Sequence, residues 1–166
     1  MRSLVVLGVV FSVTIAVLVA GAVFLGTLGS SSEDGDSIQR EPLTVVTAAG
    51  DVYHIDVEIA DTPEERSVGL SGREEIPPDT GMLFIIPVRG PGFWMKDTLV
   101  PLSVAFLARC GEIVSIQDMQ PQSLDIHTTD QDYSFGLETP QGWFTEHGVK
   151  VGDLVSIPRD YRLDGC

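Results

Sequence analysis

The amino-terminal segment constrains the fold of this chain more than any other sequence feature. No charged residue lies between Arg2 and Glu33, and residues 4–28 are mainly Val, Leu, Ile, Phe, Ala and Gly. As a helix, with a rise of about 1.5 Å per residue, this stretch is roughly 37 Å long, more than the roughly 30 Å hydrocarbon core of a bilayer. A helix on a soluble core would carry a polar stripe, which this segment lacks. We therefore expect residues 1–28 to form a transmembrane anchor.

The sequence leaves two properties of this anchor open. Residues 20–22, Ala-Gly-Ala, resemble a signal-peptide cleavage site, but the apolar run continues beyond the usual length of a signal core. We favour an uncleaved anchor over secretion after cleavage near Ala22. Only Arg2 precedes the span and acidic residues follow it, so the positive-inside rule places the amino terminus in the cytoplasm. The expectation is a single-pass cell-membrane protein whose soluble domain faces outside, with the opposite orientation as the alternative.

The rest of the chain is expected to hold one domain. Residues 29–41 are rich in Gly, Ser, Asp and Glu and predict a flexible polar linker. Short apolar runs then alternate with turn residues, so residues 42–160 are expected to form the domain and residues 161–166 a tail. A chain of 166 residues is long enough for one ordinary domain, but not for two.

The charge of the chain limits its partners. Ten Lys and Arg face 24 Asp and Glu, which gives a net charge of −14 at pH 7. Such a negative field repels phosphate backbones, so no nucleic-acid partner is expected. An acidic excess with few lysines is typical of proteins from salt-rich cells, where salt screens the self-repulsion. We interpret the acidity as a halophilic, haloarchaeal-like surface rather than as a cation site.

The spacing of apolar and turn residues predicts a mainly β domain with one or two short helices. In residues 52–60, the apolar Ile55 and Val57 alternate with acidic residues, and with residues 43–48 this segment predicts a hairpin. Residues 62–70 begin with Thr-Pro-Glu-Glu, which supplies a capping box and predicts a short helix. Further strands are expected at residues 81–86, 93–96, 100–107, 112–119, 133–138 and 154–157. Many short strands separated by Gly and Pro indicate a sandwich or a jelly-roll-like barrel.

Several segments of the domain follow one another in a recognisable order. They are residues 69–73, 81–84, 93–102 (FWMKDTLVPL), 137–138 with Gly142, and 148–153 (GVKVGD). In this order they resemble the family called domain of unknown function 192, a group of uncharacterised bacterial and archaeal proteins, over about residues 43–157. The resemblance implies a β-rich, sandwich or jelly-roll-like fold, often behind a signal or membrane anchor. It implies no established activity.

Two positions depart from the pattern that the resemblance implies. Asp97 stands where members more often have Asn, and Ser103 stands where an Asp commonly follows Pro-Leu. If that Asp is a catalytic acid or a metal ligand in relatives, its absence counts against the same chemistry in this chain.

The candidate ligand-binding residues are the ionisable and aromatic side chains of these segments. They are Arg73, Trp94, Lys96, Asp97 and Glu138. A buried charge must be paired, so Arg73, Lys96 and Glu138 predict either an internal ion pair or a pocket. In the pocket, Arg73 or Lys96 would meet an anionic or hydroxyl-bearing ligand, with Trp94 as a stacking wall. No residue is assigned a catalytic role.

No sequence motif predicts a metal or another cofactor. His54, His127 and His147 lack the spacing of a zinc site. Cys110 and Cys166 are the only two cysteines. They are expected either to form a disulfide, which an external location permits, or to remain free.

Two functions from different classes follow from this reasoning. We favour a membrane-tethered external binding module for an unknown small ligand or an envelope component. The alternative is an envelope hydrolase or lyase that uses Glu138 or Asp97 as an acid or base beside Lys96. A pocket open to solvent, in which Glu138 reaches Lys96 or Asp97, would favour the enzyme.

Overall fold

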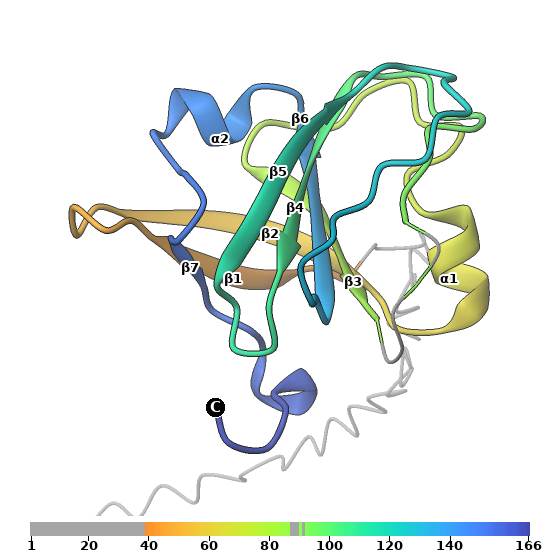
Figure 1. Ribbon diagram of the computed structural model, residues 1–166. Coiled ribbons are helices and arrows are strands. Elements are labelled where there is room, and N and C mark those ends of the chain that lie inside the picture. The colour runs from red at the N-terminus through yellow and green to blue at the C-terminus, as the bar shows by residue number, and fades with distance from the viewer. Residues whose placement is uncertain (1–38, 87–89, 91) are drawn as a thin grey trace, which may run out of the picture. The chain divides into compact units, whose positions relative to one another are not determined.

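A computed structural model describes residues 39–86, 90 and 92–166, and Figure 1 shows their arrangement. The predicted membrane anchor and nearly all of the predicted linker lie outside these residues. Within the described ranges, no helix is both long enough and apolar enough to cross a membrane.

Strands dominate the described part of the chain, which confirms the prediction of a mainly β fold with one or two short helices. The strands are β1 (Glu41–Val46), β2 (Val52–Ala60), β3 (Thr80–Ile85), β4 (Leu102–Leu107), β5 (Ile113–Met119), β6 (Phe135–Pro140) and β7 (Leu154–Val155). The helices are α1 (Pro63–Val68) and α2 (Trp143–Glu146), and a short 3-10 turn covers Arg159–Tyr161.

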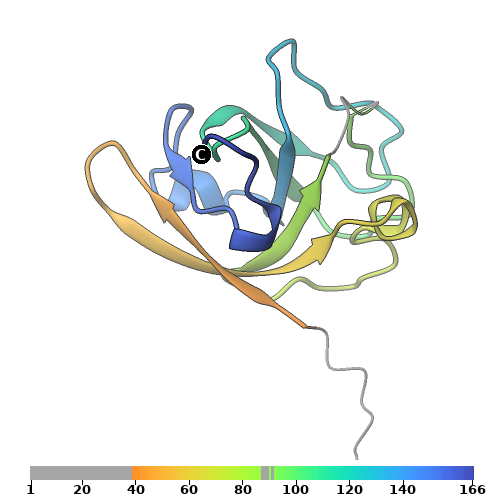
Figure 2. The ribbon, with the colours of Figure 1, turned by 90° about the horizontal axis from the view of Figure 1, so that it is seen from below.

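All these strands belong to one hydrogen-bonded sheet, in the order β5-β4-β6-β3-β2-β1-β7. The predicted hairpin is present as β1 and β2, and β4 and β5 form a second hairpin. The chain passes through α1 between β2 and β3, which pair in parallel, whereas the other neighbours are antiparallel. Figure 2 shows how strongly this sheet curls.

The curl brings the edge strands β5 and β7 together at one end. Glu112, just before β5, forms a bridge with Leu154 of β7, and the Val155 amide donates to the Gly111 carbonyl at 2.8 Å. The sheet is thus a curled half-barrel, which is nearer to the barrel than to the sandwich among the two architectures expected from the sequence. The reason is that β3 pairs with both β2 and β6, which joins the two halves of the chain in one sheet.

Each face of the sheet has its own core, because side chains alternate between the faces along a strand. The first core contains Leu83 of β3 and Leu137 of β6, covered by Trp143 of α2. The second core, on the other face, contains Phe84 of β3 and Phe106 of β4. Figure 1 shows α2 and α1 on opposite sides of the sheet.

The predicted elements agree with the observed ones to within one or two residues, with one exception. Residues 93–96 do not form a strand, since Phe93 makes a single bridge with His127. The chain then turns at Asp97, whose φ of 58° is left-handed and incompatible with an extended strand. The predicted helix ends slightly early, because Gly69, with a φ of 52°, leaves the helical conformation.

The carboxyl-terminal segment is fixed to the sheet by a disulfide. Cys110, in the turn between β4 and β5, is bonded to Cys166. The Tyr161 hydroxyl donates to the Asp61 carboxylate at 2.8 Å, which attaches the same segment to the residues before α1.

Candidate functional site

A cavity of about 490 Å³ lies beside α1, against the second core. Four aromatic side chains contribute to its lining: Phe84, Phe93, Trp94 and Tyr133. Glu138 of β6 also lines it and is the only carboxyl group among the described lining residues. The volume is within the range of about 300–1,000 Å³ that is usual for small-molecule sites. The cavity is therefore large enough for an organic ligand.

The position of Glu138 follows from the register of the sheet. It is paired with Met82 of β3 and with Val104 of β4, so apolar side chains flank it on both sides. Glu138 is only 5% exposed, and its carboxyl group makes no hydrogen bond or ion pair with any described residue. Burial raises the pKa of Glu138 to about 8, which keeps most of this carboxyl protonated at neutral pH.

Two glycines place the aromatic wall of the cavity. A Cβ on Gly136 of β6 would lie 2.2 Å from the Phe93 ring, so only a glycine allows this ring to pack on the strand. Gly92 has a φ of 98°, which favours glycine, and a Cβ there would meet a backbone carbonyl at 2.4 Å. The Phe93 and Phe84 rings then pack in a T-shaped arrangement, with 5.2 Å between their centroids. Trp94 follows at the rim and is 49% exposed.

Helix α1 forms another wall, and its start is capped locally. The Thr62 hydroxyl accepts from the Glu65 amide at 3.2 Å, and the Glu65 carboxylate accepts from the Thr62 amide at 3.0 Å. This second bond is the main reason that the pKa of Glu65 is lowered. Arg66 lines the cavity, but its guanidinium donates to the backbone carbonyls of Asp61 and Ile85. Arg66 therefore ties α1 to the end of β3.

The predicted site residues Lys96 and Asp97 lie in an exposed turn beside the rim. The Ser71 hydroxyl donates to the Lys96 carbonyl at 3.2 Å, and the Gly72 amide donates to the Asp97 carbonyl at 2.8 Å. The Lys96 ammonium nitrogen is 5.5 Å from the ring centroid of Trp94. These contacts hold the loop after α1 against the rim of the cavity.

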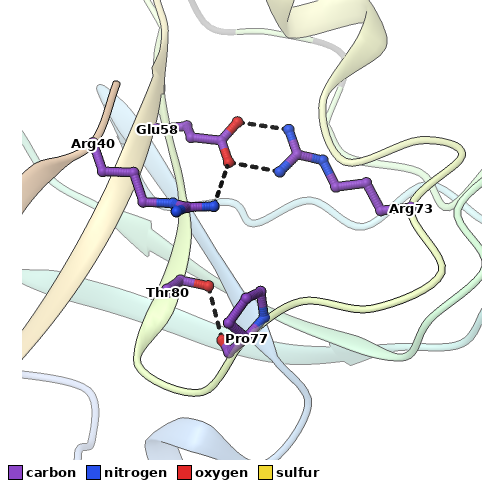
Figure 3. Close-up of polar contacts among 5 residues, drawn as sticks. All are labelled: Arg40, Glu58, Arg73, Pro77 and Thr80. Atoms are coloured by element: carbon purple, nitrogen blue, oxygen red, sulfur yellow. Dashed lines mark hydrogen bonds and ion pairs between the residues drawn. The ribbon is translucent and has the colours of Figure 1, made fainter. Parts of the chain in front are cut away.

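Arg73 lies in a neighbouring cavity of about 600 Å³, where it pairs with Glu58 of β2 (Figure 3). Two guanidinium nitrogens of Arg73 contact the two carboxylate oxygens at 2.6 Å each, and Arg40 approaches the same group at 3.4 Å. Hydrogen bonding to Glu58 raises the pKa of Arg73 above its ordinary value. Glu58 and Glu138 flank Met82 in the register, so a paired and an unpaired carboxyl group share this face of the sheet.

The fold and its motifs agree with a family model. The model DUF192, described as "Uncharacterized ACR", matches residues 44–157. The chain belongs to the DUF192 family. A comparison with curated proteins finds no match.

Two solved structures resemble this DUF192 domain. A protein from Sinorhizobium meliloti 1021, provisionally named a transcription regulator, is 34% identical, with a TM-score of 0.69. The match covers 72% of this chain and 95% of that protein. A protein of unknown function from Novosphingobium aromaticivorans DSM 12444 is 28% identical with a TM-score of 0.65, and the match covers 72% of this chain and 86% of that one.

Most of the DUF192 motifs contribute to the first cavity, whereas Gly142 and residues 148–153 do not. Residues 69–73, 81–84 and 93–102 all contribute to its lining, as does Glu138. The first departure from the family pattern, Asp97, accepts a hydrogen bond from the Gly72 amide through its backbone carbonyl. Its positive φ is tolerated by Asp and Asn alike.

Ser103, the other departure, lies one residue before Val104 and therefore on the opposite face of β4 from the Glu138 side chain. Its hydroxyl donates to Asp118 and accepts from the Gly142 amide. This departure does not alter the cavity lining.

The structure brings together only part of the predicted site. Trp94 and Glu138 line one cavity, Lys96 contacts Trp94, and Arg73 lines the second cavity. Within the described residues, no hydrogen bond or ion pair joins Glu138 to Lys96 or Asp97.

Sequence reasoning missed Glu58, the partner of Arg73, and the lining role of Tyr133. An acidic residue inside an alternating strand was the available signal for Glu58. For Tyr133 we find no comparable signal in the sequence.

Proposed function

We propose that this DUF192 member is a binding module that takes a small ligand into the cavity beside Glu138. The supporting observation is the Glu138 carboxyl group, which is buried, lines the cavity and has no partner among the described residues. A ligand in the cavity would give this carboxyl group the hydrogen bond that no described residue makes.

The lining indicates the chemistry of such a ligand. The rings of Phe84, Phe93, Trp94 and Tyr133 offer apolar contact area, and Glu138 offers one polar contact. Such sites are mostly apolar, with few polar groups that fix the orientation of the ligand. We therefore propose a ligand with an apolar body and one polar or charged group.

We also propose that the domain works outside the cytoplasm, tethered by residues 4–28, on a small ligand or an envelope component. The length of this uncharged segment supports the tether. The disulfide between Cys110 and Cys166 supports the location, because such bonds persist in oxidising compartments.

Two other functions have less support. An envelope hydrolase or lyase needs a second group that acts with Glu138, and no described contact links Glu138 to Lys96 or Asp97. The name of the Sinorhizobium meliloti relative suggests gene regulation. The net charge of −14 argues against direct binding of this chain to nucleic acid.

Ligand-observed NMR on the full-length protein tests the binding function. The probes are benzyl alcohol, benzylamine and benzoate, which share a ring and differ in their polar group. We expect at least one of them to bind, and Trp94→Ala to weaken that binding several-fold. Leu99→Ala is the matched control, because Leu99 is exposed at 44% and does not line the cavity. The proposal is wrong if no probe binds, or if Trp94→Ala binds every probe as wild type does.

A further inference from the structure

We infer that the ligand class of this cavity is a small organic ammonium ion, held between the aromatic rings and the Glu138 carboxylate. The inference rests on the proposed binding function and adds the charge of the ligand to it. Two features support it, namely the aromatic lining and the distribution of charged groups around the cavity.

The aromatic lining suits a cation. Faces of Trp, Tyr and Phe rings attract ammonium groups, and aromatic cages that bind methylated ammonium groups use the same attraction. Phe84, Phe93, Trp94 and Tyr133 surround one space here. Trp94 already accepts an ammonium group at its exposed ring, since the Lys96 nitrogen lies 5.5 Å from its centroid. A ligand ammonium would repeat this contact deeper in the cavity, where less water competes.

The charges around the cavity also favour a cation over an anion. Glu138 supplies a carboxyl group without a described counter-ion. Arg66 is the only basic side chain among the described lining residues, and it is already bonded to two backbone carbonyls. The net charge of −14 raises the local concentration of cations and lowers that of anions. An anionic ligand would therefore meet repulsion at long range and find no free cation among the described lining residues.

The affinity of an ammonium ligand and that of a neutral ligand would depend on pH in opposite ways, because they need different protonation states of Glu138. Met82 and Val104 flank Glu138 on the neighbouring strands and do not titrate. From the other walls, Arg66 and Tyr133 are the titratable groups of the described lining.

Glu58 lies on the other side of Met82 from Glu138 and is paired with Arg73 and Arg40. An ammonium ligand needs the ionised form of Glu138, so its affinity must rise with pH and level off above a pH of about 8. A neutral ligand that accepts a hydrogen bond from the protonated carboxyl must bind more weakly over the same interval.

Isothermal titration calorimetry on the full-length protein at pH 6.5, 7.5 and 8.5 tests the inference. The probes are choline and 3,3-dimethylbutan-1-ol, which have the same shape and differ in charge. We expect choline to bind at least tenfold more tightly than the alcohol at pH 8.5, and its affinity to be roughly 25-fold lower at pH 6.5, because the ionised fraction of Glu138 falls by that factor. Glu138→Gln should remove both the preference for choline and the pH dependence. Glu75→Gln, which changes an exposed carboxyl outside the cavity lining, should preserve both.

The outcomes separate the inference from the proposed function. The inference is overturned if the alcohol binds as tightly as choline, if choline binds Glu138→Gln as it binds wild type, or if its affinity falls as the pH rises. If the ammonium probes do not bind while benzyl alcohol binds in a Trp94-dependent manner, only the inference fails. If choline does not bind and none of the three benzyl probes binds in a Trp94-dependent manner, the proposed function fails as well.

Discussion

The buried carboxyl group of Glu138 predicts an unusual dependence of stability on pH. Its pKa is about 8 in the folded protein, against an ordinary value of 4.5. Between these values the folded state holds a proton that the unfolded state has lost, so the free energy of unfolding falls as the pH rises. Each pH unit in this interval lowers the free energy of unfolding by about 1.4 kcal/mol. The full contribution is therefore about 5 kcal/mol, present below pH 4.5 and absent above pH 8.

Replacement of Glu138 by Gln isolates this contribution, because Gln has nearly the same shape and does not titrate. We expect the free energy of unfolding of the variant, relative to that of wild type, to rise by about 4 kcal/mol between pH 5 and pH 9. The measurement is urea unfolding of both proteins at several pH values, with the difference between their free energies plotted against pH. Glu75→Gln serves as the control, because its carboxyl is exposed. A flat difference curve, or one with the opposite slope, would refute the assignment of Glu138 as a buried, unpaired acid.

Two further predictions concern contacts outside this cavity. Arg73→Ala should lower the free energy of unfolding by about 2 kcal/mol in urea denaturation, because it leaves the buried Glu58 carboxylate without its main partner. Arg159→Ala, in the exposed 3-10 turn, should have little effect, and equal losses in both variants would contradict the argument. Removal of the disulfide by Cys110→Ser should lower stability by up to about 4 kcal/mol, given the separation of 56 residues. The urea midpoint of wild type should then fall on addition of reductant, and an unchanged midpoint would contradict the prediction.

Local signals explain which parts of the fold the sequence could predict. The capping box of Thr62 and Glu65 involves residues three apart, so the start of α1 is visible in the sequence. The same holds for β2, whose alternating pattern gives its bounds correctly. Neither pattern contains information on which strands pair, and for this reason the sequence left a sandwich and a barrel open.

The candidate site depends more than the helices and strands do on contacts between residues that are far apart in the sequence. Arg73 and Glu58 are 15 residues apart, and they meet because β3 pairs with β2 in parallel after the crossover through α1. Phe93 reaches the cavity wall because Gly136, on a distant strand, leaves room for its ring. The sequence could single out Glu138 as an acid in apolar surroundings, but its neighbours follow only from the register.

The contrast between Glu58 and Glu138 supports a functional role for the second. Both lie on the same face of the sheet, each beside Met82, and both are less than 10% exposed. Arg73 neutralises Glu58, whereas Glu138 faces a cavity and has no partner among the described residues. An uncharged side chain such as Gln or Met at position 138 would avoid the loss of stability above pH 4.5. A group that destabilises the fold at neutral pH, and that faces an aromatic cavity of ligand size, is therefore consistent with the binding function that we propose.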